Sequence, residues 1–335
     1  MSLKAELLAR GRLLVPRGLW TGVPLSRSSA GPGAGSVSMF LRTSSGIVRL
    51  EVVRQGPAPM ELKESGGKFN IVSGRRTLAR GVVPLFGGLH APGQAFINLH
   101  DSCRYSCAFC TIGGKGRGIG PARWAAVVKD ALRQNMVNSV AVTTGIPSTP
   151  SRACRDMAHL VRRIRKEFPD VPVGVEPYTV EESDLAALRR AGASELKLNI
   201  QCASGRLFSR ICPGLDRDGI WRNLEKGVGL FGRGKVCSNI IIGLGESDRE
   251  VLDAVERLAA MGVAANIRPL KIGPLNERAL ERALGRKPSR PPAARLARLA
   301  AAQKRIFKRH RLRPSDFKTM CHRCTACDME PFVDL

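Results

Sequence analysis

Aromatic side chains, acidic residues and long apolar runs are all scarce in this 335-residue sequence. Aromatic residues make up 5% of the chain and are not interleaved with the basic ones, which argues against single-stranded nucleic-acid binding by base stacking. No run of about 18 apolar residues occurs, so no membrane-spanning helix is expected. The apolar content of 43% is ordinary for a folded protein, and the length allows one large domain with a smaller appendage.

Positive charge, in contrast, is abundant. The chain has 54 Lys and Arg residues against 28 Asp and Glu, a formal net charge of +26 that runs through most of its length. Such a charge attracts polyanions or an acidic carrier protein, although a general arginine bias or a thermophilic host would also produce it. Residues 1–29 are rich in Arg and Ser, as transit peptides are, but Glu6 and the following β-like run favour a cytoplasmic protein.

The chain has ten cysteines, and six of them lie in two tight clusters, which indicates metal binding in a reducing compartment rather than a disulfide framework. The first cluster is Cys103, Cys107 and Cys110, between an apolar strand and a glycine-rich loop. Three thiolates within eight residues can bind an iron–sulfur cluster or zinc. Three ligands would leave one iron of a four-iron cluster open to another molecule. A structural zinc knuckle or unrelated cysteines are the alternatives.

The spacing Cys-x3-Cys-x2-Cys, with the aromatic Phe109 before the last cysteine, closely resembles the signature of the radical S-adenosylmethionine (SAM) enzymes. In that superfamily the open iron binds the amino and carboxylate groups of SAM, and an electron from the cluster cleaves the sulfonium. The resemblance therefore implies that Cys103, Cys107 and Cys110 are the catalytic ligands of a [4Fe–4S] cluster, with Phe109 beside the cofactor.

Three regions are predicted along the chain. Residues 1–92 form a small β-rich module with a helix at 2–10, and strand, loop and helix then repeat six times over 93–275. The predicted strands are 95–100, 138–143, 171–176, 195–200, 236–242 and 264–270, and the helices are 121–135, 152–168, 181–191, 216–231, 248–262 and 292–311. Alternating strands and helices indicate parallel pairing, and six such units resemble the partial α/β barrel, (β/α)6, of radical SAM proteins. Residues 276–335 form a C-terminal helix and a second cysteine segment.

The ends of the second and third strands carry residues that suit a SAM pocket at the carboxyl ends of the barrel strands. Thr143, Thr144 and Gly145 take the place of the superfamily's Gly-Gly-Glu motif, whose glutamate is missing here. A Thr-Thr-Gly run at a strand end is also compatible with an ordinary turn. Glu176 ends the third strand, where a carboxylate would bind the ribose hydroxyls or the methionine amine; an exposed Glu before Pro is the alternative.

Further candidates come from the later strands. Alternation points Lys197, Asn199 and Gln201 to one side, where a polar cofactor or salt bridges in the barrel floor would satisfy them. The run from Asn239 to Glu246 resembles the superfamily's Gly-x-Ile-x-Gly-x-x-Glu element, whose backbone contacts adenine, although an ordinary strand–turn–helix junction has similar glycines. The candidate cofactor contacts here are Asn199, Gln201, Ile242, Gly243, Gly245 and Arg268, with Arg210 and Arg222 for the SAM carboxylate.

The second cluster is Cys321, Cys324 and Cys327, whose Cys-x2-Cys-x2-Cys spacing is comparable with that of ferredoxins. Beside a SAM cluster we interpret it as an auxiliary [4Fe–4S] cluster, with zinc and His322 or an outside ligand as the alternative. The fourth ligand is not visible in the sequence. The candidates are Cys154, Cys202, Cys212, Cys237 and Asp328, although isolated cysteines are otherwise small buried hydrophobes.

Within the superfamily the chain resembles the biotin-synthase-like branch, and within it a subunit of the archaeal-type, two-protein lipoyl synthase. The resemblance rests on the β-rich N-terminal region, the run Asn98-Leu-His-Asp-Ser-Cys103, the Thr-Thr-Gly-x-Pro run and the late cysteine cluster. Ordinary lipoyl synthases, in contrast, carry their auxiliary cysteines before the SAM triad. The resemblance implies two [4Fe–4S] clusters, SAM, and sulfur insertion into the octanoyl chain of an octanoyl-lysyl carrier. An acidic octanoylated carrier, a second radical SAM subunit and a reductant such as ferredoxin are the implied partners.

Other functions stay open. The charge would also suit a radical SAM enzyme that modifies tRNA by methylthiolation or methylation, but no appended RNA-binding domain is apparent, so nucleic acid is not the favoured partner. Another C–H functionalising enzyme of the biotin-synthase-like branch is a third possibility. A non-catalytic iron–sulfur or zinc protein would leave the six βα units and the adenine-type strand without a purpose.

Overall fold

A computed structural model describes residues 2–27, 31–112 and 119–335. Most of the glycine-rich loop that the sequence predicts after Cys110 lies outside the described residues. None of the described helices is long and apolar enough to cross a membrane.

The N-terminal region is a small β-barrel. Its elements are α1 (Leu3–Arg10), β1 (Arg12–Leu14), β2 (Ser26–Arg27), β3 (Val37–Thr43), β4 (Gly46–Val53), β5 (Met60–Ser65), β6 (Lys68–Ser73) and β7 (Arg76–Leu85), with short 3-10 turns at Arg17–Leu19 and Gly31–Gly33. The strand order is β2-β3-β4-β1-β5-β6-β7, and β3 also pairs with β7, which closes the sheet. Along β4, Val48 and Leu50 are buried in the core, so Arg49 and Glu51 lie on the opposite face.

The second sheet carries the βα units that the sequence predicts. Its strands are β8 (His90–Ala91), β9 (Gln94–Asn98), β10 (Ser139–Thr143), β11 (Val173–Glu176), β12 (Glu195–Lys197), β13 (Val236–Ile242) and β14 (Val263–Pro269). Strands β9 to β14 are parallel and adjacent in chain order, and the short β8 is antiparallel to β9. The predicted α/β partial barrel is therefore confirmed. The fourth strand is shorter than predicted, because regular pairing ends at Lys197. The chain stays next to β13 as far as Gln201, which forms an isolated parallel bridge with Ile240 and has a left-handed backbone conformation, with φ of 56°.

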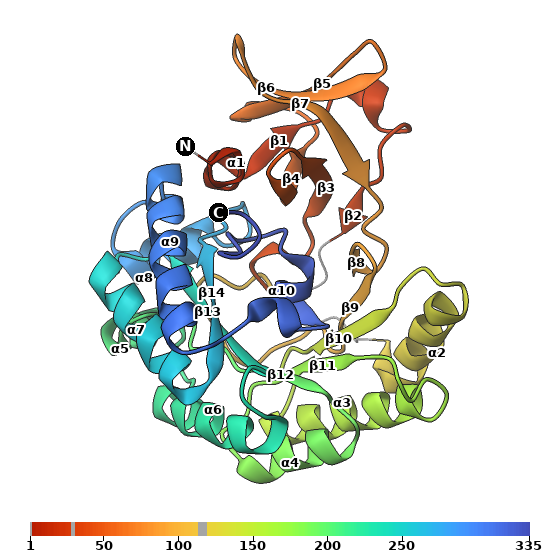
Figure 1. The fold of residues 1–335 in the computed structure, drawn as a ribbon, viewed down its shortest axis with the longest axis vertical. Coiled ribbons are helices and arrows are strands. Elements are labelled where there is room, and N and C mark those ends of the chain that lie inside the picture. The colour runs from red at the N-terminus through yellow and green to blue at the C-terminus, as the bar shows by residue number, and fades with distance from the viewer. Residues whose placement is uncertain (1, 28–30, 113–118) are drawn as a thin grey trace.

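The six predicted helices cover the barrel, and further short helices join them (Figure 1). The helices are α2 (Gly120–Arg133), α3 (Pro150–Arg165), α4 (Glu182–Arg190), α5 (Gly205–Ile211), α6 (Arg217–Phe231), α7 (Asp248–Met261), α8 (Glu277–Leu284), α9 (Ala293–Arg309) and α10 (Met320–Cys324), with a 3-10 turn at Pro314–Asp316. The sequence prediction missed three short helices, α5, α8 and α10. Helix α7 begins with a capping box between Ser247 and Glu250.

The C-terminal segment packs inside the barrel. Figure 1 shows α10 near the centre of the ring of strands, below the N-terminal sheet. The Glu195 carboxylate accepts hydrogen bonds from the backbone nitrogens of Lys318 and Thr319, both at 2.8 Å. Gln94 Oε1 accepts one from the Met320 nitrogen at 2.6 Å. A Cβ on Gly174 would clash with Thr319 Oγ1, so this glycine allows the segment to pack against β11.

The same segment is joined to the N-terminal region. Lys4 Nζ is fully buried and lies 2.7 Å from Asp334 Oδ2 and 2.6 Å from the Thr325 carbonyl oxygen. The Arg49 backbone nitrogen donates to the Ala326 carbonyl at 2.8 Å. The two ends of the chain therefore hold the cysteine segment between the two sheets.

Candidate functional site

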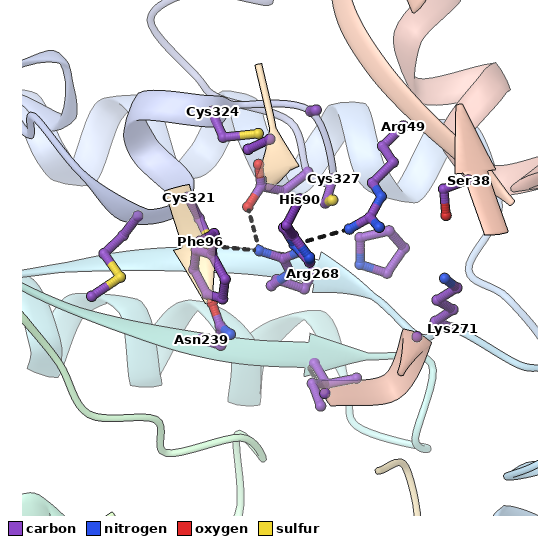
Figure 2. A pocket seen from close by; sticks show the side chains of 18 of the residues that line it. Ser38, Arg49, His90, Phe96, Asn239, Arg268, Lys271, Cys321, Cys324 and Cys327 are labelled. Carbon is purple, nitrogen blue, oxygen red and sulfur yellow. Dashed lines mark hydrogen bonds and ion pairs between the residues drawn. The ribbon is translucent and has the colours of Figure 1, made fainter. Parts of the chain in front are cut away.

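A cavity of about 200 Å³ lies where the barrel, the N-terminal sheet and the C-terminal segment meet. Thr143, Glu176 and Arg268 come from the carboxyl halves of their strands, which is where barrel enzymes carry their chemistry, whereas Gln94 lines the cavity from the start of β9. The lining includes Thr143, Glu176, Asn199, Gln201 and Arg268 from the barrel, Ser38, Arg49 and Glu51 from the N-terminal sheet, and Cys321, Cys324, Cys327 and Asp328 from the C-terminal segment. Figure 2 shows Ser38, Arg49 and Lys271 on one side of the cavity and Cys321 and Phe96 on the other.

The loop that carries the first triad starts at the end of β9 and packs against the end of β10. Asn98 Nδ2 donates to the His100 carbonyl oxygen at 2.9 Å, and His100 Nδ1 lies 2.7 Å from Thr144 Oγ1. A Cβ on Gly145 would clash with the Ser102 carbonyl and lie 2.8 Å from that of His100. Thr144 and Gly145, predicted to contact SAM, therefore position the cysteine loop.

The three thiols of the first triad are free and partly buried. Burial raises the pKa of the Cys110 thiol to about 12, and Cys107, Cys103 and Glu176 act in the same direction. A hydrogen bond with Cys212 lowers the pKa of Cys107. Cys110 thus lies near its two partners and near a carboxylate of the cavity. Cys212, a candidate fourth ligand for the second triad, instead lies beside the first.

The second triad has a strongly cationic environment. Cys321 Sγ accepts hydrogen bonds from Lys197 Nζ at 3.2 Å and from Arg268 Nη1 at 2.9 Å, the latter drawn in Figure 2. Burial raises the pKa of the Cys324 thiol to about 12. Burial also raises the pKa of Cys327, but Arg268 and a second arginine more than offset this, so the net pKa lies below its ordinary value. The thiolate form is therefore stabilised unequally within the triad.

Lys197 joins the second triad to the predicted SAM pocket. Its side chain is 2% exposed and lies 3.2 Å from Glu176 Oε1, which also accepts a hydrogen bond from Asn199 Nδ2 at 2.6 Å. Burial alone would lower the pKa of Lys197, but Cys321 and Glu176 raise it above its ordinary value. The salt-bridge interpretation therefore holds for Lys197, whereas a cofactor contact of Asn199, which lines the cavity, stays a prediction.

The structure brings some predicted cofactor contacts to the cavity and leaves others outside it. Phe109, Thr143, Glu176, Asn199, Gln201 and Arg268 line it. The residues outside the lining are Thr144, Gly145, Arg210, Arg222, Ile242, Gly243 and Gly245. Arg222 is 68% exposed and pairs with Asp216 at 3.4 Å. Ile242 is buried in the core, and a Cβ on Gly243 would meet the Ser289 carbonyl at 3.1 Å. These positions lie outside the cavity lining, and their contacts with SAM stay predictions.

The candidate fourth ligands of the second triad lie in different parts of the structure. Asp328 lines the cavity, 3.6 Å from Arg268 Nη1, whereas Cys154 is buried within α3. Cys237 is fully buried on β13, and burial raises its pKa. His322, considered as a zinc ligand, has its Nδ1 atom 3.1 Å from Glu330 Oε2 and is not in the cavity lining.

Sequence reasoning missed the contribution of the N-terminal sheet. Ser38, Arg49 and Glu51 of that sheet line the cavity, as do His90 of β8 and Lys271 after β14. The alternation of buried and half-buried residues along β4 places Arg49 and Glu51 on the same face of the strand, but the sequence does not show which part of the chain packs over that face. No sequence signal indicates His90 or Lys271.

Comparison with known proteins identifies the barrel. Residues 97–258 match the model of the radical SAM superfamily. This chain carries a radical SAM domain. Its curated relatives include a lipoyl synthase of Chloroflexus aurantiacus, 25% identical over 178 residues that cover 50% of this chain and 56% of the relative. A biotin synthase of Cutibacterium acnes is 27% identical over 177 residues, 50% of this chain and 48% of the relative. The chain thus spans about half the length of these relatives. Its similarity to both a lipoyl synthase and a biotin synthase is consistent with a biotin-synthase-like branch.

Solved structures agree on the fold. The FeFe-hydrogenase maturase HydG from Carboxydothermus hydrogenoformans superposes with a TM-score of 0.53 at 13% identity, over 65% of this chain and 52% of that one. Methylornithine synthase (PylB) gives a TM-score of 0.51 at 15% identity, over 64% of this chain and 63% of that one. At these identities the likeness concerns the fold alone.

The radical SAM family implies a [4Fe–4S] cluster and SAM, and the described residues fit both. The three soft thiols of the first triad share one loop at the carboxyl end of β9. Asn239 Oδ1, in the cavity lining, is buried with no partner among the described residues, and a polar cofactor would satisfy it. Across 2–27, 31–112 and 119–335 no three ligand side chains are already grouped to hold a metal ion. The thiols of each triad would therefore have to come closer together to hold a cluster.

Proposed function

We propose that this protein is a sulfur-inserting radical SAM enzyme similar to a lipoyl synthase subunit, and that it acts on the octanoyl chain of an octanoyl-lysyl carrier. One observation carries the proposal: Phe109, from the loop of the first triad, and all three cysteines of the second triad line a single cavity. Sulfur insertion into an unactivated C–H bond needs a carbon radical and a sulfur source beside each other. The similarity to lipoyl synthases and biotin synthases supports the same chemistry.

When bound, the first cluster and SAM would supply a 5′-deoxyadenosyl radical, and a second [4Fe–4S] cluster on Cys321, Cys324 and Cys327 would supply sulfide. The residues of the chain then orient and screen these groups. Glu176 and Asn199 offer polar contacts to SAM, and Lys197 and Arg268 donate hydrogen bonds to Cys321.

The walls of the cavity support a linear acyl chain as substrate. The N-terminal sheet and the C-terminal segment both contribute to its lining, so a radical formed there would be shielded from bulk water. Phe96 of β9 and Met320 of α10 both line the cavity and pack together with Ala141, and they provide apolar surface for such a chain. An octanoyl group needs this combination of apolar wall and nearby sulfur.

We propose three partners for this reaction: an acidic octanoylated carrier, a second radical SAM subunit and a reductant such as ferredoxin. The net charge of +26 supports docking of an acidic carrier through electrostatic attraction. We expect the affinity for an octanoylated carrier to fall between low and physiological ionic strength. An affinity that did not change with salt would exclude a docking role for the charge.

The same charge favours a second candidate, a radical SAM enzyme that modifies tRNA. We expect tRNA to copurify and to be released at moderate salt if this alternative is correct. Another C–H functionalising enzyme of the biotin-synthase-like branch would use the same cavity with a different substrate.

The decisive experiment is anaerobic turnover of the reconstituted protein with dithionite, SAM and an octanoyl-lysyl peptide, analysed by mass spectrometry. We expect 5′-deoxyadenosine together with peptide that has gained sulfur. Formation of 5′-deoxyadenosine with an unchanged peptide would exclude this substrate. Failure to cleave SAM would contradict the radical reaction itself.

A further inference from the structure

The face that the N-terminal sheet turns toward the cavity is polar, which is unusual for a surface buried between two parts of one chain. Ser38 pairs with Glu51 across β3 and β4, and Arg49 lies two residues before Glu51, so all three share that face. The Ser38 side chain is fully buried, lines the cavity, and its Oγ atom has no partner in the described part of the chain. A buried hydroxyl without a partner indicates that a polar ligand completes the site.

His90 presents a second donor. Its Nε2 atom lies 3.0 Å from Arg49 Nη1, and because arginine only donates, Nε2 accepts and the proton of the neutral ring lies on Nδ1. Burial and the nearby Arg49 lower the pKa of His90 well below its ordinary value, in agreement with a neutral ring. The Nδ1 atom is buried and has no partner among residues 2–27, 31–112 and 119–335.

The backbone of His90 supports a functional role. Its φ of 85° lies in a region that side chains other than glycine rarely adopt. The ring is held by stacking on Phe96, with 4.8 Å between the ring centres. Strain of this kind persists where the surrounding structure fixes a side chain in a required position.

The charges around the cavity leave a positive excess. Among the described lining residues, five are cationic and three are acidic: Arg49, Lys197, Arg268, Lys271 and Arg290 against Glu51, Glu176 and Asp328. The proposed second cluster would contribute about one negative charge with three thiolate ligands. With or without that cluster, the described lining keeps an excess of cationic over acidic side chains, which favours binding of an anion.

The excess is concentrated at one end of the cavity. Lys271 Nζ lies 3.0 Å from Ser36 Oγ and 3.6 Å from Glu51 Oε2, and in Figure 2 it lies on the same side as Ser38 and Arg49. Glu51 is thus the carboxylate at this end, whereas Glu176 pairs with Lys197 in the barrel. Hydroxyl, imidazole N–H and ammonium donors together suit a group that only accepts hydrogen bonds.

We propose that the end of the cavity formed by Ser38, Arg49, His90 and Lys271 binds a carboxylate group of the substrate, next to the C-terminal cysteines. The site goes beyond the proposed sulfur insertion, because an octanoyl amide itself carries no charge. The carboxylate belongs either to an acidic residue beside the modified lysine of a carrier or to a free organic acid.

The test compares the binding of sodium octanoate and octanamide, which have the same chain and differ in charge, to the reconstituted protein with SAM and without reductant. Calorimetry is the measurement. We expect octanoate to bind about tenfold more tightly, as is typical of charge-assisted hydrogen bonds. Ser38→Ala and Lys271→Met should each reduce this preference. Lys63→Met is the matched control, because Lys63 is 54% exposed on the same N-terminal sheet.

A second pair of ligands separates the two sources of the carboxylate. Octanoyl-lysyl peptides with Glu or Gln beside the modified lysine differ only in that charge, and a preference for Glu assigns the carboxylate to the carrier. A preference for octanoate without a peptide preference assigns it to a free acid. The proposal is overturned if neither pair shows a charge preference, or if the preference survives in both cavity variants. Because no turnover is involved, these outcomes are independent of whether sulfur is inserted.

Folding controls keep the variants interpretable. Iron content and the melting temperature report whether each variant retains its clusters and fold. Ser38→Ala removes a single buried hydroxyl and therefore perturbs packing least. A normal melting temperature with an unchanged octanoate preference in this variant would count against the site.

Discussion

Cys103, Cys107 and Cys110 lie on one loop after a buried strand, whereas Cys321, Cys324 and Cys327 lie on a segment held by contacts from both ends of the chain. The start of the first loop is fixed by neighbours close in sequence or on the adjacent strand, such as the contact of His100 with Thr144. Its end is also held from a distance, because the Ala108 nitrogen donates to the Ile211 carbonyl and Asn276 Nδ2 donates to the Phe109 carbonyl. The second segment is fixed by Gln94, Glu195 and Lys4, more than 120 residues away. The first triad thus combines local and distant contacts, whereas the contacts that fix the second come from both ends of the chain and from the barrel.

The two triads also differ in electrostatics. Cys110 has a carboxylate, Glu176, among the groups that raise the pKa of its thiol. Cys321, in contrast, accepts hydrogen bonds from two cations. Positive charge and hydrogen bonds at thiolate sulfur raise the reduction potential of an iron–sulfur cluster. We therefore expect a cluster on the second triad to be reduced more easily than the SAM cluster.

Loss of one cysteine from each triad should separate the two roles most strongly. We expect Cys103→Ala to abolish formation of 5′-deoxyadenosine, by about 100-fold or more, because the ligand itself is lost. Cys321→Ala should retain SAM cleavage while losing sulfur insertion. Both are measured by chromatography and mass spectrometry of an anaerobic turnover. Equal loss of SAM cleavage in the two variants would remove the distinction between the triads.

A methyl group added at Gly174 should displace the segment that carries the second triad and leave the first triad in place. A Cβ on Gly174 would clash with Thr319 Oγ1 and lie 2.8 Å from Met320 Cε. We expect Gly174→Ala to destabilise the fold by about 1–3 kcal/mol, as overpacking does, and to reduce the iron bound after reconstitution. Thermal unfolding and iron analysis are the measurements.

Gly229 provides the control for that substitution. It lies in α6, and a Cβ there would meet no atom within 4 Å. Gly229→Ala should leave the iron content unchanged and stabilise the helix by up to about 1 kcal/mol. Should both alanine variants retain full iron and stability, the packing of the C-terminal segment against β11 would not matter for the second triad.

The first triad and the barrel could be predicted from the sequence, because apolar strands, helix spacing and clustered cysteines are all short-range signals. The cavity could not. The contact between Lys197 and Cys321 joins residues 124 positions apart, and Ser38 reaches the site only because the N-terminal sheet packs over the barrel. Thr144 and Gly145 show a contact that the sequence did not predict: the Thr144 hydroxyl contacts His100, and the absence of a Cβ on Gly145 leaves room for the His100 and Ser102 carbonyls of the cysteine loop. Their contact with SAM stays a prediction.

Removal of one of the two cations at Cys321 should reduce the difference in potential between the clusters. We expect Lys197→Met to lower the reduction potential of the second cluster and to leave that of the SAM cluster nearly unchanged. Potentiometric titration followed by electron paramagnetic resonance measures both. Lys226→Met is the control, since Lys226 is 56% exposed on α6 and pairs with Glu182 of α4, away from the cavity lining. An equal shift of both potentials would mean that Lys197 acts through the fold rather than through Cys321.

The smallest expected effect is a pH dependence of octanoate affinity, caused by Lys271 near the second triad. Burial lowers the pKa of Lys271 from 10.5 to about 8, and Arg49 acts in the same direction, whereas Glu51 and Cys327 oppose them. As the pH rises through about 8, Lys271 loses its proton, so a bound carboxylate loses its ammonium partner and the affinity for octanoate falls. Arg290, whose pKa burial lowers to about 10, remains protonated in this range.

Octanoate binding measured between pH 7 and 9 should weaken by up to about tenfold in the unaltered protein, because the protonated fraction of a group with this pKa falls by that factor. Lys271→Met should bind octanoate more weakly at pH 7 and show little further change at pH 9. Octanamide, which needs no cation, should bind equally across the range. If octanamide lost affinity to the same extent, the pH dependence would not come from the loss of the Lys271 proton. It would then reflect the cavity as a whole, and Lys271 would contribute no electrostatic difference between the surroundings of the two triads.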